Sequence, residues 1–152
     1  MANPDDLQQI IALRLRLFGD LVDFNHGKGV DAELQAATSA YFERSFTGDD
    51  CKTWLAEADG QIVAAGTLAI FSRPPYPGNV SGKDAYLLNM FTLPEYRGKG
   101  HGKAVLQQAM HYAQQHGYGK VWLHASDQGR PLYAAAGFVE DSSYMEWVIA
   151  ES

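Results

Sequence analysis

Two stretches near the start of the chain place their apolar residues at helical spacing. The first runs from Leu7 to about Asp23 and the second from Asp31 to Phe46. Asn3-Pro4-Asp5-Asp6 supplies a capping residue, a proline and two acids, as helix starts often do. Gly27 and Gly29 separate the two stretches. We therefore expect two amphipathic helices with these residues on their buried faces: Leu7, Ile10, Ile11, Phe18, Leu21, Val22, Leu34, Ala37, Tyr41, Phe42 and Phe46.

The period of the pattern changes after Cys51. Lys52 to Glu57 and Ile62 to Phe71 read as strands, and Asp59-Gly60 between them is a strong hairpin signal. The next stretch, Ser72 to Asp84, holds three prolines in four positions and shows neither period. Irregular loops of this length are usually functional or mobile. This loop is therefore a candidate wall of a binding site, and a simple connector is the alternative.

The chain from Ala85 to His116 combines a clear strand signal with a clear helix signal. Tyr86 to Phe91 is an apolar run of strand length, and after a turn the helical spacing returns until Gly117 ends it. We expect these elements downstream: a strand at Lys120–Ala125, a short helix from Pro131, and strands near Phe138–Glu140 and Tyr144–Ile149. The pattern predicts one α/β domain over residues 1–152, with a mixed sheet of about six strands and about four helices.

Composition and charge argue against several classes of protein. The 152 residues are 46% hydrophobic and 20% charged, as in an ordinary globular domain. The net charge of -6 argues against nucleic acid as a partner. It mildly favours a cationic substrate, and ordinary solubility charge explains it equally well. The chain shows neither a signal peptide nor an apolar run of membrane-spanning length, so we expect a cytoplasmic protein with no membrane partner.

Cysteine and histidine provide no metal or redox motif. Cys51 is the only cysteine, which excludes an intrachain disulfide, and the five histidines form no H-E-x-x-H pattern. His111 and His116 are five positions apart on the predicted helix, so their side chains point in different directions. We therefore expect no metal site.

The seven residues Arg97-Gly98-Lys99-Gly100-His101-Gly102-Lys103 lie between the central strand and its helix. A helix N-terminus has unpaired amides and the positive end of the helix dipole, and glycine lets an anion approach the backbone. The dinucleotide fingerprint fails because Lys103 stands at its third glycine, and the Walker loop fails because Ala104 follows Lys103. The loop therefore predicts a pyrophosphate site of another kind.

Together with the preceding Leu93-Pro94-Glu95-Tyr96, this loop resembles the core motif of the GNAT superfamily of acyl-CoA-dependent N-acetyltransferases. Leu132-Tyr133 followed by Gly137-Phe138 is similar to the family's L-Y-x-x-x-G-F, and the resemblance covers roughly Cys51 to Trp147. It implies transfer of the acetyl group of acetyl-CoA to a primary amine of a small molecule or peptide. A longer acyl-CoA, or a non-catalytic module that senses acyl-CoA, are the alternatives.

The resemblance also implies how the cofactor binds. The family's sheet splays open beside its core strand, where backbone groups matching Met90, Phe91 and Thr92 pair with the pantetheine arm and one amide stabilises the oxyanion. The pyrophosphate would be held by Arg97, Gly98, Lys99, Gly100, His101, Gly102 and Lys103. Ser126-Asp127 stands where many relatives carry a cofactor-binding asparagine. Met1 to Asn3 leave no room for the family's usual first strand, so that edge is either truncated or covered by a partner chain, and a homodimer is possible.

Tyr133 matches the family's tyrosine that faces the thioester sulfur. We expect it to act in catalysis by a hydrogen bond to the departing thiolate, and packing under Phe138 is the structural alternative. An acceptor amine must also lose a proton before it attacks. Asp84, Glu57 and His124 are candidates for this base, as is a chain of water that ends on a carboxylate.

Other polar residues are candidates for binding the acceptor. Asn89 interrupts the apolar central strand, and Tyr76 and Asp84 belong to or follow the proline-rich loop. Arg14 and Arg16 interrupt the first helical stretch, where we expect solvated side chains, although either could reach a substrate carboxylate.

Overall fold

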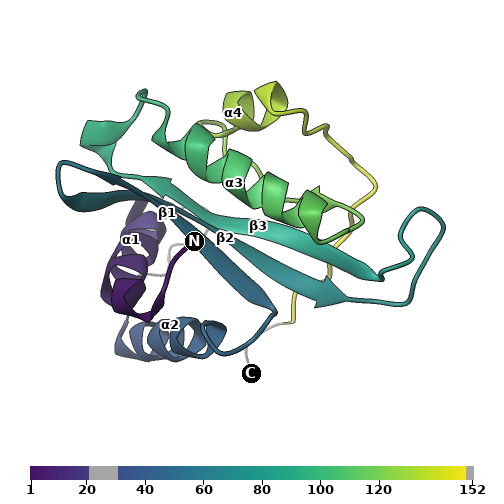
Figure 1. Cartoon of the computed structure of the whole chain (residues 1–152), viewed down its shortest axis with the longest axis horizontal. Helices are drawn as coiled ribbons and strands as arrows, with labels where there is room; N and C mark the ends of the chain where they lie inside the picture. The colour runs from purple at the N-terminus through teal and green to yellow at the C-terminus, as the bar shows by residue number, and fades with distance from the viewer. Residues whose placement is uncertain (21–30, 150–152) are drawn as a thin grey trace.

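The computed structural model of the chain describes residues 1–20 and 31–149. Within them, a four-stranded sheet lies between two layers of helices (Figure 1). The strands, in chain order and also in sheet order, are β1 (Cys51–Ala58), β2 (Gln61–Ser72), β3 (Lys83–Thr92) and β4 (Val121–Trp122). The first three are antiparallel, and β4 is parallel to β3. The mixed sheet that the sequence predicts is therefore present.

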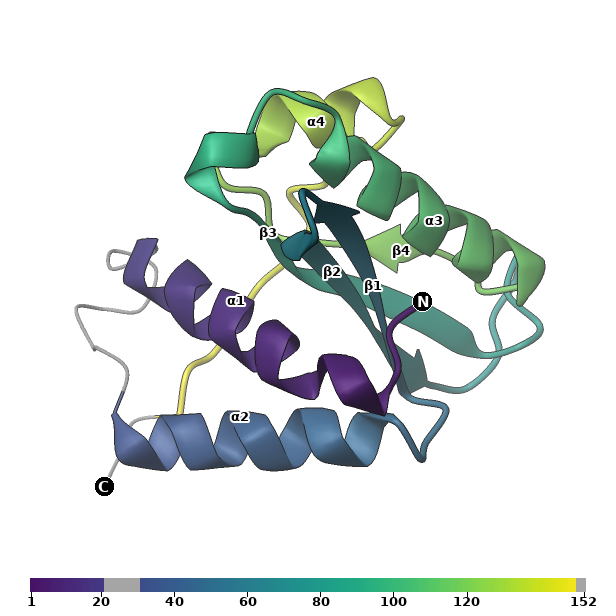
Figure 2. The ribbon, with the colours of Figure 1, turned by 60° about the vertical axis from the view of Figure 1, so that its left-hand side comes forward.

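Helices cover both faces of this sheet (Figure 2). The four α-helices in the described residues are α1 (Leu7–Asp20), α2 (Ala32–Ser45), α3 (His101–Gln115) and α4 (Arg130–Ala135). The first two lie on one face, and α3 and α4 lie on the other. Helices on both faces of a mixed sheet place the chain in the α/β class.

The predicted helix starts are confirmed. Asn3 accepts a hydrogen bond from the Asp5 amide before a 3₁₀ turn at Pro4–Asp6, and Asp31 accepts one from the Leu34 amide at 2.8 Å. These caps pair amides that have no partner within the helix. The last part of the first predicted helix, together with Gly27 and Gly29, lies outside the described residues.

Apolar burial on the two faces of the sheet attaches the helices to it. On the α3 face, Leu68 and Leu106 are fully buried in one cluster. On the opposite face, Ile10 of α1 packs with Phe42 of α2, and Leu13 packs with Phe91 of β3. Each side chain of this kind contributes about 1.5–3 kcal/mol when it is fully buried.

The hairpin between β1 and β2 confirms the sequence signal at Asp59-Gly60. Asp59 has φ 52° and Gly60 has φ 75°, so both residues adopt the left-handed backbone that a two-residue hairpin turn favours. Tight closure of this turn sets β1 against the part of β2 from Gln61 to Ala69, with one irregularity in register between Ala56 and Glu57.

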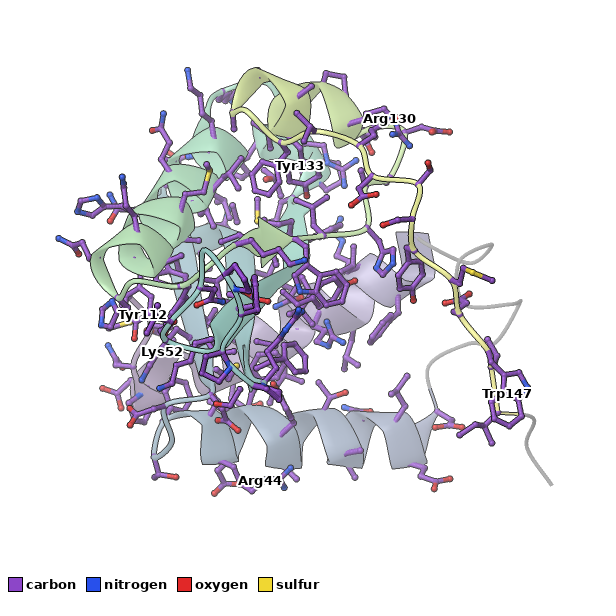
Figure 3. All side chains as sticks on the ribbon, turned by 90° about the vertical axis from the view of Figure 1, so that its right-hand side faces the viewer. Arg44, Lys52, Tyr112, Arg130, Tyr133 and Trp147 are labelled. Carbon is purple, nitrogen blue, oxygen red and sulfur yellow. The ribbon has the colours of Figure 1, made fainter. Side chains whose placement is uncertain are left out.

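The prediction of about six strands is wrong, because the described residues contain four. The strand expected at Lys120–Ala125 is present only as Val121–Trp122, and residues 138–149 form no strand. Val139 and Trp147 are 88% and 91% exposed, and Trp147 projects away from the sheet (Figure 3). Alternating residues give a segment the propensity for a strand, but a strand also requires a neighbour that accepts and donates its backbone hydrogen bonds.

The edge of the sheet at β1 has no additional strand within the described residues. The Ala2 amide donates to the Thr53 carbonyl at 2.8 Å, which is the contact of the N-terminal residues with this edge. No strand among the described residues therefore corresponds to the family's usual first strand. Whether a second chain covers the edge stays a prediction.

Candidate active site

A cleft of about 760 Å³ opens where β3 and β4 diverge. The two strands pair only at Ala85 with Val121 and at Tyr86 with Trp122. Beyond these pairs, residues 87–92 of β3 form one wall, and residues 124–126 and the start of α4 form the other. The predicted splay of the sheet is present, and it exposes backbone groups of β3 that a full-length neighbour strand would have paired.

A bulge interrupts β3 within this wall. Ala65 pairs with Phe91 and Thr67 pairs with Leu88, so that Asn89 and Met90 both lie opposite Gly66. Asn89 has φ 58°, the left-handed backbone that asparagine tolerates better than most residues. A bulge leaves one residue outside the regular ladder and bends the strand. Met90, Phe91 and Thr92, at and just after this bulge, line the cleft.

Gly66 allows this bulge to pack closely. A Cβ at this position would lie 2.5 Å from Met90 Sδ and 2.7 Å from Val105 Cγ1. Only glycine therefore fits between the bulge and α3 without displacing one of them. Gly66 belongs to none of the sequence motifs that predict the site, but it shapes the cleft wall by allowing the bulge.

The glycine loop lies at one end of the cleft. Gly98 and Gly100 have φ of 76° and 87°, and a Cβ at either would meet nothing within 4 Å. Gly100 begins α3 without a side-chain cap, and the first amide to bond within the helix is that of Ala104. The amides of His101, Gly102 and Lys103 are therefore available to an anion, and all three residues line the cleft.

Arg97 connects the glycine loop to the central strand. Its Nε donates to the Thr92 carbonyl at 2.9 Å, and its guanidinium lies 5.3 Å from the centre of the Phe91 ring. Arg97 also lines the cleft. Lys99 is the one predicted cofactor residue that does not line it, since its Nζ lies over the Tyr96 ring at 5.3 Å.

Tyr133 points from α4 into the interior and lines the cleft (Figure 3). Its ring packs edge-on against Phe138 at 5.9 Å, as the structural alternative from the sequence expects, and its role in catalysis stays a prediction. Gly129 makes room for it, because a Cβ there would lie 2.9 Å from the Tyr133 ring. Burial raises the pKa of Tyr133, with a smaller contribution from Tyr86, and the hydroxyl therefore keeps its proton at neutral pH.

Tyr86 and His124 form a polar pair in the cleft that the sequence motifs did not predict as a unit. The Tyr86 hydroxyl lies 2.7 Å from His124 Nδ1, and both residues line the cleft. The strand register explains why the two residues meet. Tyr86 pairs with Trp122, and His124, two positions after Trp122, projects from the same face of the sheet. Burial raises the pKa of Tyr86, so Tyr86 remains a neutral phenol at ordinary pH.

The other predicted acceptor residues lie apart. Asp84 is 2% exposed and is held by Tyr76, Asn79 and Arg73, with Arg73 Nη1 at 3.2 Å. This network ties the proline-rich loop to the start of β3, so the loop is an ordered connector, and neither Tyr76 nor Asp84 lines the cleft. Glu57 is exposed and is also outside it.

Asn89 does line the cleft, but its side chain is buried at 3% exposure. Its Nδ2 lies 3.4 Å from Thr67 Oγ1, and Oδ1 has no hydrogen-bond partner among the described residues. Ser126 lines the opposite wall, and its hydroxyl accepts a hydrogen bond from the Gly129 amide before α4. Both residues therefore help to shape the cleft, and neither contact shows a role in binding a ligand.

Two further observations concern the described part of the chain. No helix there has both the length and the hydropathy to span a lipid bilayer. No group of three or more histidine, cysteine, aspartate or glutamate side chains in residues 1–20 and 31–149 is placed to hold a metal ion.

Relatives and solved structures support one family. The chain is 29% identical over 124 residues to an uncharacterised N-acetyltransferase, YhfO, of Bacillus subtilis, and the match covers 78% of each protein. A crystal structure of a predicted acetyltransferase from Clostridium acetobutylicum with acetyl-CoA has a similar fold, with a TM-score of 0.83 and 26% sequence identity. The comparison covers 97% of this chain and 92% of that one. An aminoglycoside N-acetyltransferase at 19% identity shares the fold, with a TM-score of 0.75.

The sequence profile of the Acetyltransferase (GNAT) family matches residues 16–138. This range contains the splayed strands, the glycine loop and Tyr133. The family uses acetyl-CoA and acts on small-molecule or peptide acceptors. The glycine loop fits that group, because its open glycines and uncapped helix start leave space and amides for a pyrophosphate. The chain therefore belongs to the GNAT family of acetyltransferases.

Proposed function

We propose that this protein transfers the acetyl group of acetyl-CoA to the primary amine of a small molecule or peptide. The observation that carries the proposal is the shared cleft, which places the glycine loop, the bulged strand and Tyr133 around one space. Each of these would supply a different requirement of acyl transfer, namely phosphate binding, polarisation of a carbonyl and stabilisation of a leaving group. A second, smaller cleft between the N-terminal residues and the start of β1 contains none of them.

The binding end of this mechanism is the glycine loop. The amides of His101, Gly102 and Lys103 would donate to the pyrophosphate, and the side chains of Arg97 and Lys103 would balance its charge. Backbone groups of Met90, Phe91 and Thr92 would hold the pantetheine arm beside the bulge, and an amide left outside the ladder would polarise the carbonyl. Acetyl-CoA supplies an activated acetyl group as its thioester.

Proton transfer would be divided between two sides of the cleft. In the reaction, a bond from the amine nitrogen to the acetyl carbon forms and the bond from that carbon to sulfur breaks. Tyr133 would donate a hydrogen bond to the sulfur as it becomes a thiolate. The amine must lose a proton, and His124 is the candidate base that lines the cleft, since Asp84 and Glu57 do not.

The arrangement of Tyr86 supports this role for His124. The hydrogen bond to the Tyr86 hydroxyl orients the ring, and in the tautomer whose Nδ1–H donates to the Tyr86 oxygen, Nε2 can accept a proton directly or through water. A water chain that ends on a carboxylate is disfavoured, since none of the described residues lining the cleft is aspartate or glutamate.

The test is a calorimetric titration with acetyl-CoA and with CoA, followed by thiol release against a panel of amines. Binding of acetyl-CoA and turnover with some of the amines would support the proposal and identify the acceptor class. Binding without turnover on any amine would favour a sensor of acyl-CoA. Absence of binding would overturn the assignment of the glycine loop. The cytoplasmic location and the homodimer stay predictions.

A further inference from the structure

The charges that line the cleft are opposite in sign to those of the chain as a whole. The chain has 18 acidic and 12 basic residues, yet the described residues that line the cleft include no acid and three permanent cations, Arg14, Arg97 and Lys103. Low-dielectric walls of one charge sign concentrate the field inside a cleft. The mild preference for a cationic substrate that follows from the net charge therefore does not apply at the site itself.

Two of these three cations already have a role in the proposed function. Arg97 and Lys103 belong to the glycine loop and the start of α3, where a pyrophosphate would bind. Arg14 belongs to α1, on the opposite face of the sheet (Figure 2). It therefore serves another part of the cleft, at the wall that α1 forms with Tyr86 and its neighbours in β3.

Among the described residues, the side chains that contact Arg14 are aromatic. Its guanidinium lies 4.7 Å from the centre of the Phe18 ring and 6.0 Å from that of Phe42. No carboxylate of the described residues forms an ion pair with it, and burial lowers the pKa of Arg14. Because an arginine keeps its charge even when its pKa is lowered, a partly buried cation is left with no counter-ion from the described chain.

We propose that the acceptor amine also carries an anionic group, a carboxylate or a phosphate, and that Arg14 binds this group. Guanidinium binds both oxyanions by paired, charge-assisted hydrogen bonds, and the aromatic rings beside it orient the fork. A polyamine carries no anionic group that Arg14 could bind. None of the described residues that line the cleft is a carboxylate that could bind its ammonium groups. This inference rests on the proposed acetyl transfer and narrows its acceptor.

The experiment compares acceptors in matched pairs by thiol release at saturating acetyl-CoA. One pair is an α-amino acid and its primary amide, and the other is an amino-sugar phosphate and the parent amino sugar. The anionic member of at least one pair should have the higher kcat/KM, by about tenfold to a hundredfold, as for one charge-assisted hydrogen bond. The pair that shows the preference identifies the anion as carboxylate or phosphate. A polyamine should be the poorest substrate.

The variant Arg14→Gln keeps a polar side chain of similar length but removes the charge. It should abolish the preference by raising KM for the anionic amine, while KM for acetyl-CoA is unchanged. Arg14→Lys should restore part of the preference. Arg16→Gln is the matched control, because Arg16 lies on the same helix, is exposed and does not line the cleft. Its preference should equal that of the unaltered protein.

The outcomes separate this inference from the proposed function. Acetyl transfer that is equally fast with neutral amines, or unaltered in Arg14→Gln, would overturn the role of Arg14 and leave the transferase standing. If no amine is acetylated, the proposed function fails, and titration of the anionic amines into the CoA-saturated protein decides the role of Arg14. If the anionic amines bind and Arg14→Gln abolishes this binding, an anion site at Arg14 is supported. If they do not bind, the anion site is overturned.

Discussion

The Tyr86 hydroxyl lies 2.7 Å from Nδ1 of His124, across the point where β3 and β4 stop pairing. The pair closes the paired end of the cleft and leaves Nε2 as the free nitrogen of the imidazole ring. Tyr144, on the C-terminal segment, also contacts the His124 ring edge-on at 5.3 Å. The imidazole is therefore oriented by contacts on two sides, as a group that accepts a proton from a bound amine requires.

We predict that His124→Gln lowers kcat by roughly a hundredfold to ten thousandfold, the usual contribution of a positioned base. Tyr86→Phe should lower it less, because the ring loses its orienting hydrogen bond and keeps its basic nitrogen. Thiol release at saturating substrates measures both effects. The control is His116→Gln, since His116 is exposed at the end of α3 and does not line the cleft. Wild-type turnover in His124→Gln would remove this residue from the mechanism.

Tyr133→Phe should lower kcat and leave the Kd for acetyl-CoA unchanged. The substitution keeps the ring that packs on Phe138 and removes only the hydroxyl that would face the leaving sulfur. Turnover and calorimetric titration of the same preparation test the two halves of this prediction. If acetyl transfer is demonstrated and the substitution leaves it unaffected, Tyr133 is a packing residue and its assigned role is wrong.

Gly100→Val should abolish CoA binding, because the branched side chain would enter the space in front of the α3 amides. The left-handed backbone at Gly100 adds a folding cost of about 1–3 kcal/mol. Gly60→Val is the matched control: it has φ 75° and an equally open Cβ position, but lies in the β1–β2 hairpin. Titration with CoA should separate the two variants. Equal CoA affinity for both would contradict the anion site.

Gly66→Ala should destabilise the protein by about 1–3 kcal/mol, as expected for overpacking a tight interface. The added methyl group would lie 2.7 Å from Val105 Cγ1, on a helix that cannot easily move, and 2.5 Å from the more flexible Met90 side chain. Urea unfolding measures the loss. Gly102→Ala is the comparison, because its Cβ would make ordinary contacts at 3.5 and 3.7 Å, and its stability should be close to that of the unaltered protein.

Stability should fall as the pH rises from about 10 to about 12. Burial raises the pKa of Tyr41 and of Tyr118 to about 12, from 10.0 in the unfolded chain. In this window the unfolded state loses the two protons first, so rising pH favours unfolding, and the contribution is complete below pH 10. The double variant Tyr41→Phe with Tyr118→Phe should show a shallower fall in chemical unfolding. Identical pH dependence would show that these phenols ionise normally.

Local signals in the sequence were sufficient for much of this protein. The hairpin at Asp59-Gly60, the cap at Asp31 and the glycine loop before α3 depend on a few adjacent residues, because backbone conformation and helix ends are decided over that range. For the same reason, the motifs identified the family from their spacing, and they predict that Tyr133 and the loop belong to one site.

Other properties depend on contacts between segments that are distant in the sequence. Residues 138–149 have a strand-like pattern but no neighbour to pair with, and Asp84, a candidate for the site, forms an ion pair with Arg73 and accepts a hydrogen bond from Tyr76. The bulge depends on Gly66 and Val105 in two other elements. The pair of Tyr86 with His124 joins residues 38 positions apart, and Arg14 of α1 lines the same cleft as both of them. Pairing, burial and local charge are tertiary quantities, whereas turns and caps are local ones.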